Sequence, residues 1–181
     1  MSQQTSEEAL ITPLFSSETI QERVEEMGRE IAKEYRVATR NSPLAVVAVL
    51  KGAFMFAADL LRAISLPCTI DFISASSYGS EKTSSGKLTL RHTLSLADRH
   101  VLLVEDIIDT GLTMQVLTRE VMEMKPASLK ICTLLDKPHA RKHPVEIAYT
   151  GFMVPDTFIV GYGTDYNERY RELPAIGVLR S

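Results

Sequence analysis

The hydrophobic positions of this chain fall into two kinds of pattern that follow each other along the sequence. One kind repeats every three to four residues and predicts amphipathic helices. The clearest example follows Ser17, a suitable N-cap, and further helices are expected at 54–64 and 114–124. The first helix would bury a single face, formed by Ile20, Val24, Met27 and Ile31.

The other kind is a short apolar run, which is typical of a strand buried on both faces. Such runs alternate with the helical patterns, and this order indicates βαβ units. The sequence therefore predicts an α/β fold with a mainly parallel twisted sheet flanked by helices. The expected strands are 44–50, 69–75, 88–94, 101–104, 129–135, 147–152 and 158–160.

Composition narrows the class of protein. The length of 181 residues favours a single domain, which we expect to span 1–181 with residues 1–12 frayed. A net charge of −3, with both signs interspersed, argues against a protein that neutralises nucleic-acid phosphates. No apolar run reaches the ~20 residues of a membrane span, and the polar start lacks a signal-peptide pattern. Because the only cysteines are the separated Cys68 and Cys132, we expect a cytoplasmic protein with reduced thiols.

The strongest chemical signal follows the apolar run 101–104. Two acids, Glu105 and Asp106, stand where we expect that strand to end. In open α/β sheets, ligands bind beyond the carboxyl ends of the strands. Carboxylates at that place could hold hydrated Mg²⁺ or accept hydrogen bonds from ribose hydroxyls.

The next residues form a loop that opens the helix at 114–124, and this loop suits a phosphate. A helix N-terminus offers free backbone N–H groups and a partial positive charge. Gly111 lets the backbone approach closely, and Thr110 and Thr113 add hydroxyl donors. Asp109 would repel a phosphate unless its carboxylate points elsewhere, toward a proton that it can take.

The whole run 101–113 closely resembles the motif that binds 5-phosphoribosyl 1-diphosphate (PRPP) in type I phosphoribosyltransferases, in the form typical of the hypoxanthine-guanine branch. The resemblance implies that family's fold, with a small hood lobe built from the chain ends. It also implies Mg²⁺-dependent transfer of ribose 5-phosphate from PRPP to N9 of a 6-oxopurine, with Asp109 as the base at N7. Leu112 departs from the commoner polar residue, and its backbone N–H would still reach the phosphate. The alternative is an ordinary acidic turn.

Two earlier segments also match the family. Lys51 and Gly52 follow a strand, and taken alone they are more typical of a surface turn than of an anion site. The resemblance makes them the pyrophosphate-binding loop and implies a cis peptide between Leu50 and Lys51. Ser77 and Tyr78, in the stretch 76–87, are typical of an exposed loop, and they resemble the mobile loop that closes over the family's active site.

Three later segments extend the resemblance. Lys137 would donate to the 6-oxo group of the purine, Phe158 would stack on the base, and the backbone of Ile159 would touch its edge. Asp165 would ligate a Mg²⁺ carried with pyrophosphate, with its backbone near the purine, and Arg171 would bind the pyrophosphate oxygens. Each segment alone has an ordinary alternative, namely a solvated lysine, a core phenylalanine and a charged turn.

Other functions fit the pattern less well. A nucleotide-sensing regulator that binds nucleic acid should carry a recognition helix or a basic stripe, and a Rossmann enzyme should carry Gly-x-Gly-x-x-Gly after its first strand. The sequence has neither. His139 and His143 are bracketed by prolines, which disfavours the helix that a zinc pair would need. The expected partners are PRPP and a 6-oxopurine, without nucleic acid or membrane, and the family implies a homodimer or homotetramer.

Overall fold

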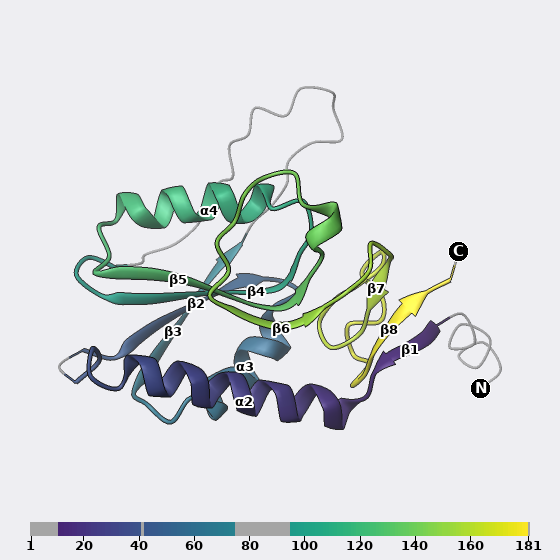
Figure 1. The fold of residues 1–181 in the computed structure, drawn as a ribbon, viewed down its shortest axis with the longest axis horizontal. Helices are drawn as coiled ribbons and strands as arrows, with labels where there is room; N and C mark the ends of the chain where they lie inside the picture. The colour runs from purple at the N-terminus through teal and green to yellow at the C-terminus, as the bar shows by residue number, and fades with distance from the viewer. Residues whose placement is uncertain (1–10, 41, 75–94, 181) are drawn as a thin grey trace.

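The computed structural model describes residues 11–40, 42–74 and 95–180 (Figure 1). The expected strand 88–94 and the stretch 76–87 therefore lie outside the described residues. Among those described, no helix is long and apolar enough to cross a membrane. The elements are β1 (Ile11–Phe15), α2 (Ser17–Tyr35), β2 (Leu44–Leu50), α3 (Phe54–Ala63), β3 (Cys68–Ser74), β4 (His100–Ile108), α4 (Leu112–Glu123), β5 (Ser128–Asp136), the 3₁₀ turn η1 (Pro138–Ala140), β6 (Tyr149–Met153), β7 (Ile159–Val160) and β8 (Ile176–Leu179).

The larger sheet carries the fold. Within the described residues it has five strands in the order β3-β2-β4-β5-β6, and every neighbouring pair is parallel. The α/β fold expected from the sequence is thus confirmed. The register pairs Ala48 with Val104 and Ile108 with Asp136, so the carboxyl ends of the three central strands meet at one edge of the sheet.

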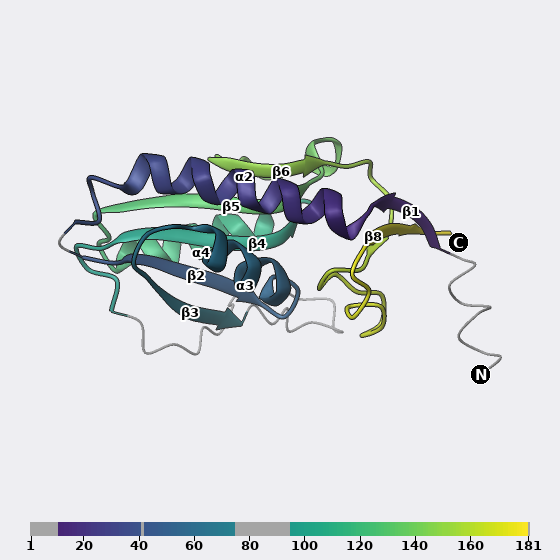
Figure 2. The same cartoon turned by 90° about the horizontal axis from the view of Figure 1, so that it is seen from below.

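Helices cover both faces of this sheet, with α2 and α3 on one side and α4 on the other (Figures 1 and 2). Successive side chains along a strand point to opposite faces of the sheet, so each strand contributes residues to two hydrophobic cores. On β2, Leu44, Val46 and Ala48 pack toward α2 and α3. Its other residues, such as Val47 and Val49, pack toward α4. This two-sided burial explains why the strands are apolar throughout.

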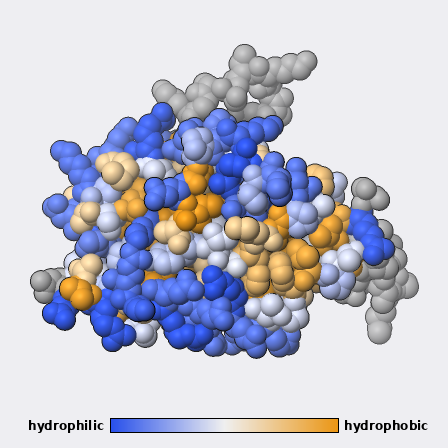
Figure 3. Space-filling model, in the orientation of Figure 1, coloured by the Kyte–Doolittle hydropathy of each residue, from blue (hydrophilic) through white to orange (hydrophobic). Residues whose placement is uncertain are grey.

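A second, antiparallel sheet forms the hood, with the order β1-β8-β7. Ile11 pairs with Leu179, and Ile159 pairs with Val178, so the two ends of the chain build this lobe as expected. β1 begins at Ile11, which means that the last residues of the stretch 1–12 belong to a strand and are not frayed. In the view of Figure 3 the surface over α2 is mostly hydrophilic, and apolar residues gather over β6 and the hood.

Three expectations need correction. The N-cap of α2 is Ser16, whose hydroxyl accepts a hydrogen bond from the Thr19 N–H, and Ser17 is the first helical residue. β4 does not end at Val104, because its pairing with β5 continues to Ile108 and carries both acids inside the strand. Strand β8 was not expected, since its four residues include a glycine and show no clear alternation.

Gly28 is a point of close contact between α2 and α3. A Cβ at this position would lie 2.5 Å from the Ala63 Cβ and 2.6 Å from the Ala63 carbonyl carbon. Alanine has a helix propensity about 1 kcal/mol better than glycine, but overpacking a core costs ~1–3 kcal/mol. We expect Gly28→Ala to lower the free energy of unfolding by about 1 kcal/mol, measured by urea denaturation. Glu22→Ala, on the exposed face of α2, is the control, and a gain in stability at Gly28 would contradict the close contact.

Candidate active site

The carboxyl ends of β2 and β4 open into a cleft of about 450 Å³. The hood closes one side of it, because Asp165 and Arg171 also line the wall. A larger hollow of about 720 Å³ lies between α2, α3 and the hood, but it contains none of the strand-end groups. We therefore assign the site to the smaller cleft, which is lined by Val49, Leu50, Lys51, Gly52, Glu105, Asp106, Ile107, Ile108, Asp109, Thr110, Gly111, Thr113, Met114, Asp165 and Arg171.

Two carboxyl groups from β4 lie at the floor of this cleft. Glu105 and Asp106 are only 7% and 8% exposed. Burial raises the pKa of the Glu105 carboxyl well above its usual range, and the charge of Asp106 adds to the rise. Burial also raises the pKa of Asp106, while the Arg171 guanidinium acts in the opposite direction. A cation bound in the cleft would stabilise the charged forms of both carboxyl groups and so lower their pKa values.

The turn after β2 depends on a glycine at position 52. A Cβ on Gly52 would lie 2.0 Å from Oδ2 of Asp106, so only glycine lets the turn approach this carboxylate. The preceding peptide, between Leu50 and Lys51, is cis, as the family resemblance implied. Lys51 and Gly52 line the same cleft as the two buried acids.

The loop before α4 presents backbone groups to the cleft. Gly111 is the N-cap with φ of +86°, and α4 has no side-chain cap, which leaves its first N–H groups available. Thr110 and Thr113 line the cleft. The side chain of Leu112 is half exposed and is not part of the lining, so only its backbone could serve a phosphate.

A second segment holds this loop in place. Arg141 donates from Nε to the Asp109 carbonyl at 3.0 Å, from Nη2 to the Ile108 carbonyl at 3.3 Å, and to the Asp136 carboxylate. The N–H groups of Lys142 and His143 both donate to the Thr110 carbonyl, at 3.0 and 2.9 Å. Sequence analysis missed this role of Arg141 and Asp136, although an acid and an arginine around an expected strand end were a usable signal.

Lys137 links the cleft to the segment expected to bind a purine. Its side chain is buried, and Nζ donates to the Thr157 carbonyl at 2.7 Å. The same Nζ lies 3.5 Å from the Asp109 carboxylate and 3.8 Å from that of Asp156. Lys137 is thus not a solvated surface lysine. The structure brings together Lys137 and Asp109, which lie 28 residues apart in the sequence.

The aromatic side of the site lies beside the cleft and does not line it. Phe158 is 67% exposed and meets Tyr166 edge to face, with ring centroids 5.7 Å apart. The side chain of Ile159 is buried in β7. The exposed ring of Phe158 argues against the core phenylalanine that was its ordinary alternative. Ser77 and Tyr78 lie outside the described residues.

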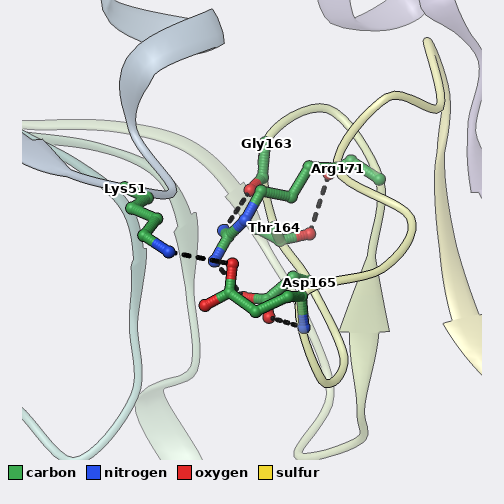
Figure 4. A network of polar contacts seen from close by, with 7 residues as sticks. Lys51, Gly163, Thr164, Asp165 and Arg171 are labelled. Carbon is green, nitrogen blue, oxygen red and sulfur yellow. Dashed lines mark hydrogen bonds and ion pairs between the residues drawn. The ribbon is translucent and has the colours of Figure 1, made fainter.

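The hood loop adds a cluster of charges (Figure 4). Arg171 donates to the Gly163 carbonyl at 2.7 Å and pairs with the Asp165 carboxylate at 2.8 Å. Its Nε is buried and has no hydrogen-bond partner among the described residues. Lys51 reaches across to Glu168, at 3.1 Å. The hydrogen bond from the Lys51 ammonium lowers the pKa of the Glu168 carboxyl. The sequence patterns had assigned no role to Glu168.

The carboxylates of the cleft fit a metal that is shared with a substrate. Within the described part of the chain, no group of three or more His, Cys, Asp or Glu side chains could hold an ion by itself. Mg²⁺ in phosphate-binding sites uses one or two protein carboxylates, waters and the substrate's own oxygens. Glu105, Asp106 and Asp165, spread around the cleft, suit that mode of binding better than a closed protein cage.

The parallel sheet, the loop between β4 and α4 and the cationic turn after β2 lie where the sequence resemblance to phosphoribosyltransferases implied. A family model described as the phosphoribosyl transferase domain matches residues 16–167, and the chain belongs to this family.

The similar proteins point to one branch of the family. The chain is 48% identical to the hypoxanthine-guanine phosphoribosyltransferase of Mycobacterium avium, over 92% of this chain and 84% of that protein. It is 47% identical to the enzyme of that name from Bacillus subtilis, over 92% of both chains. The hypoxanthine phosphoribosyltransferase of Trypanosoma cruzi, in complex with the product IMP, superposes with a TM-score of 0.87 at 42% identity, over 93% of both chains.

The buried acids predict a specific pH dependence of stability. An acid whose pKa is raised by folding contributes most below its unfolded pKa of about 4.3, and this stability is lost as the pH rises through the folded value. The loss for one such group is at most about 1.4 kcal/mol per pH unit. We expect the melting temperature of the ligand-free protein to fall less between pH 5 and pH 8 in Glu105→Gln than in the unmodified chain. Glu123→Gln, at the exposed end of α4, should keep the full fall, and equal falls in all three proteins would contradict the burial argument.

Proposed function

We propose that this chain is a Mg²⁺-dependent hypoxanthine phosphoribosyltransferase that also accepts guanine. It transfers the 5-phosphoribosyl group from PRPP to N9 of the base, giving IMP or GMP and pyrophosphate. The observation that carries the proposal is the pair of Lys137 and Asp109, 3.5 Å apart beside the phosphate loop. A cation next to a carboxylate matches the adjacent O6 and N7–H of a 6-oxopurine, which offer an acceptor and a donor side by side.

Each part of the cleft has a role toward PRPP in this proposal. The backbone of Gly111 and Leu112, with the hydroxyls of Thr110 and Thr113, binds the 5-phosphate at the start of α4. The carboxylates of Glu105 and Asp106 accept hydrogen bonds from the ribose hydroxyls. Lys51, Gly52 and Arg171 hold the pyrophosphate group, to which the guanidinium of Arg171 offers charged N–H donors.

The chemical step needs a leaving group, a nucleophile and a base. The bond between C1 of the ribose and the pyrophosphate oxygen breaks, and its electron pair leaves with pyrophosphate, which the cations of Lys51 and Arg171 stabilise. N9 of the purine forms the new bond to C1. The proton on N7 passes to the Asp109 carboxylate, which Arg141 holds in position through the loop backbone. Phe158 stacks on the base, and the backbone of Ile159 and Asp165 borders its edge.

A bound Mg²⁺ would supply charge neutralisation for the departing pyrophosphate. Glu105, Asp106 and Asp165 are the carboxylates that would hold it together with PRPP. The two carboxyl groups of β4 carry raised pKa values without a cation, and this electrostatic cost supports a cation as part of the working site.

The proposal extends to assembly and location. In the Trypanosoma cruzi enzyme, the C-terminal region has a role in the oligomeric state and the activity. We expect this chain to form a homodimer or homotetramer. Cys68 and Cys132 are both free thiols, which suits the reducing cytoplasm. A regulator that senses nucleotides is not favoured, because the similar proteins are named as enzymes.

A turnover assay with PRPP and Mg²⁺ tests the proposed function. Hypoxanthine and guanine should both be used, and kcat/KM for hypoxanthine should exceed that for adenine by about 10⁴-fold. The reason is that the Lys137 ammonium is donor-only, so it would face the amino group of adenine with no acceptor between them, whereas a 6-oxopurine offers it a carbonyl oxygen. The same reactions in excess chelator should show no turnover. A preference for hypoxanthine below tenfold would remove Lys137 from the base site, and full activity in chelator would remove the metal.

Asp109 is tested by removing its charge without changing its shape. We expect Asp109→Asn to lower kcat by ~10²–10⁴-fold, because the amide cannot accept the N7 proton. The KM for PRPP should change little, since the backbone of the loop is kept. Pre-steady-state mixing is needed to confirm that chemistry limits the rate. Asp156→Asn, which removes the other carboxylate near Lys137, is the matched control and should retain most of the activity.

A further inference from the structure

Glu168 stands between the two cations that the proposed function assigns to pyrophosphate. Its Oε2 atom lies 3.1 Å from Nζ of Lys51 and 3.5 Å from Nη2 of Arg171. One carboxylate oxygen therefore contacts a cation from the turn after β2 and a cation from the hood. This is the arrangement that an oxygen of a bound pyrophosphate would require.

The backbone at Glu168 forms a tight turn, because Tyr166 and Arg169 exchange backbone hydrogen bonds at 3.2 and 3.1 Å on either side of Asn167 and Glu168. Glu168 has φ of +61°, and its neighbours Asn167 and Tyr170 have φ of +52° and +74°. A two-residue turn of this kind requires positive φ at both central residues, and Glu168 adopts it although it is not a glycine. The Glu168 side chain is about two-thirds exposed, so it contributes little to the core.

A hydrogen bond to Asp165 holds the backbone of Glu168 in this turn. The N–H of Glu168 donates to Oδ2 of Asp165 at 2.8 Å, while Oδ1 of Asp165 pairs with Arg171 (Figure 4). Asp165 thus ties the backbone of Glu168 to the guanidinium that the Glu168 carboxylate approaches. The strained turn and this bond together place an anion over the cations of the cleft.

We propose that Glu168 is an internal counter-ion, which occupies the place of a pyrophosphate oxygen and is displaced when PRPP binds. This inference rests on the proposed function and adds a role for a residue whose carboxylate contacts both cations assigned to pyrophosphate. In the free protein the carboxylate balances Lys51 and Arg171. When pyrophosphate is ready to leave, the same carboxylate competes for both cations and favours release.

Glu168 could instead help Lys51 to bind pyrophosphate, and the two roles predict opposite changes in affinity when the carboxylate is removed. If Glu168 served to orient Lys51 for binding, its removal would weaken the affinity for pyrophosphate. If it competes, its removal should strengthen that affinity. The sign of the change in Kd therefore separates the two roles, and a purely structural ion pair would change the melting temperature without a specific effect on pyrophosphate.

The experiment is calorimetric titration of the purified, unmodified chain and of Glu168→Gln with inorganic pyrophosphate in the presence of Mg²⁺. We expect Glu168→Gln to bind roughly threefold to tenfold more tightly, as suits the loss of competition from two exposed ion pairs. Glu172→Gln removes the same charge from an exposed residue next to Arg171 in the sequence and is the matched control. It should bind like the unmodified chain.

Steady-state kinetics gives an independent measure. The KM for PRPP should fall in Glu168→Gln by a similar factor, while the KM for hypoxanthine stays unchanged. An equal or weaker affinity of Glu168→Gln for pyrophosphate, relative to Glu172→Gln, overturns the counter-ion. If the unmodified chain turns over hypoxanthine and PRPP but this result is obtained, only the counter-ion fails. If the unmodified chain neither binds pyrophosphate nor turns over, the proposed function fails with it.

Discussion

The register of the parallel strands is the constraint on which the site depends. Ala48 is level with Val104 and Ile108 is level with Asp136, so the turn after β2, the acids of β4 and the end of β5 meet at one edge. A shift of one residue would turn every side chain of a strand to the other face of the sheet. The two cores prevent this shift, because each face of β2 is already filled with buried residues.

Two parts of the chain enclose the cleft at this edge of the sheet, namely the segment after β5 and the hood. The segment after β5 fixes the loop before α4 from outside, through Arg141 and the N–H groups of Lys142 and His143. The hood closes the other side with Arg171, and it does so because β1 and β8, from opposite ends of the chain, pair with each other. Distant parts of the sequence therefore meet at the cleft without a long-range covalent link.

The sequence predicted those parts of the structure that depend on local patterns. The apolar runs located β2 and β5, and the run 101–113 located the loop between β4 and α4, because a strand, a short loop and a helix N-terminus are all encoded by neighbouring residues. The contact between Lys137 and Asp109 and the hydrogen bonds of Arg141 form through tertiary packing. The acid and the arginine around the end of β5 were the only local signal for the role of Arg141, and they did not indicate its partners. The extent of β4 was misjudged because acids usually end a strand, whereas here the pairing with β5 continues past them.

The left-handed residues of the hood loop also limit how this protein can be redesigned. Glycine at position 168 would relieve backbone strain, and a method that ranks substitutions by folding energy alone would favour it. The same change would delete the carboxylate that faces Lys51 and loosen the turn that carries Arg171. Thermostability and the positioning of charge thus make opposing demands on one residue. Engineering for heat resistance is better directed to surfaces distant from this loop, such as the exposed face of α2.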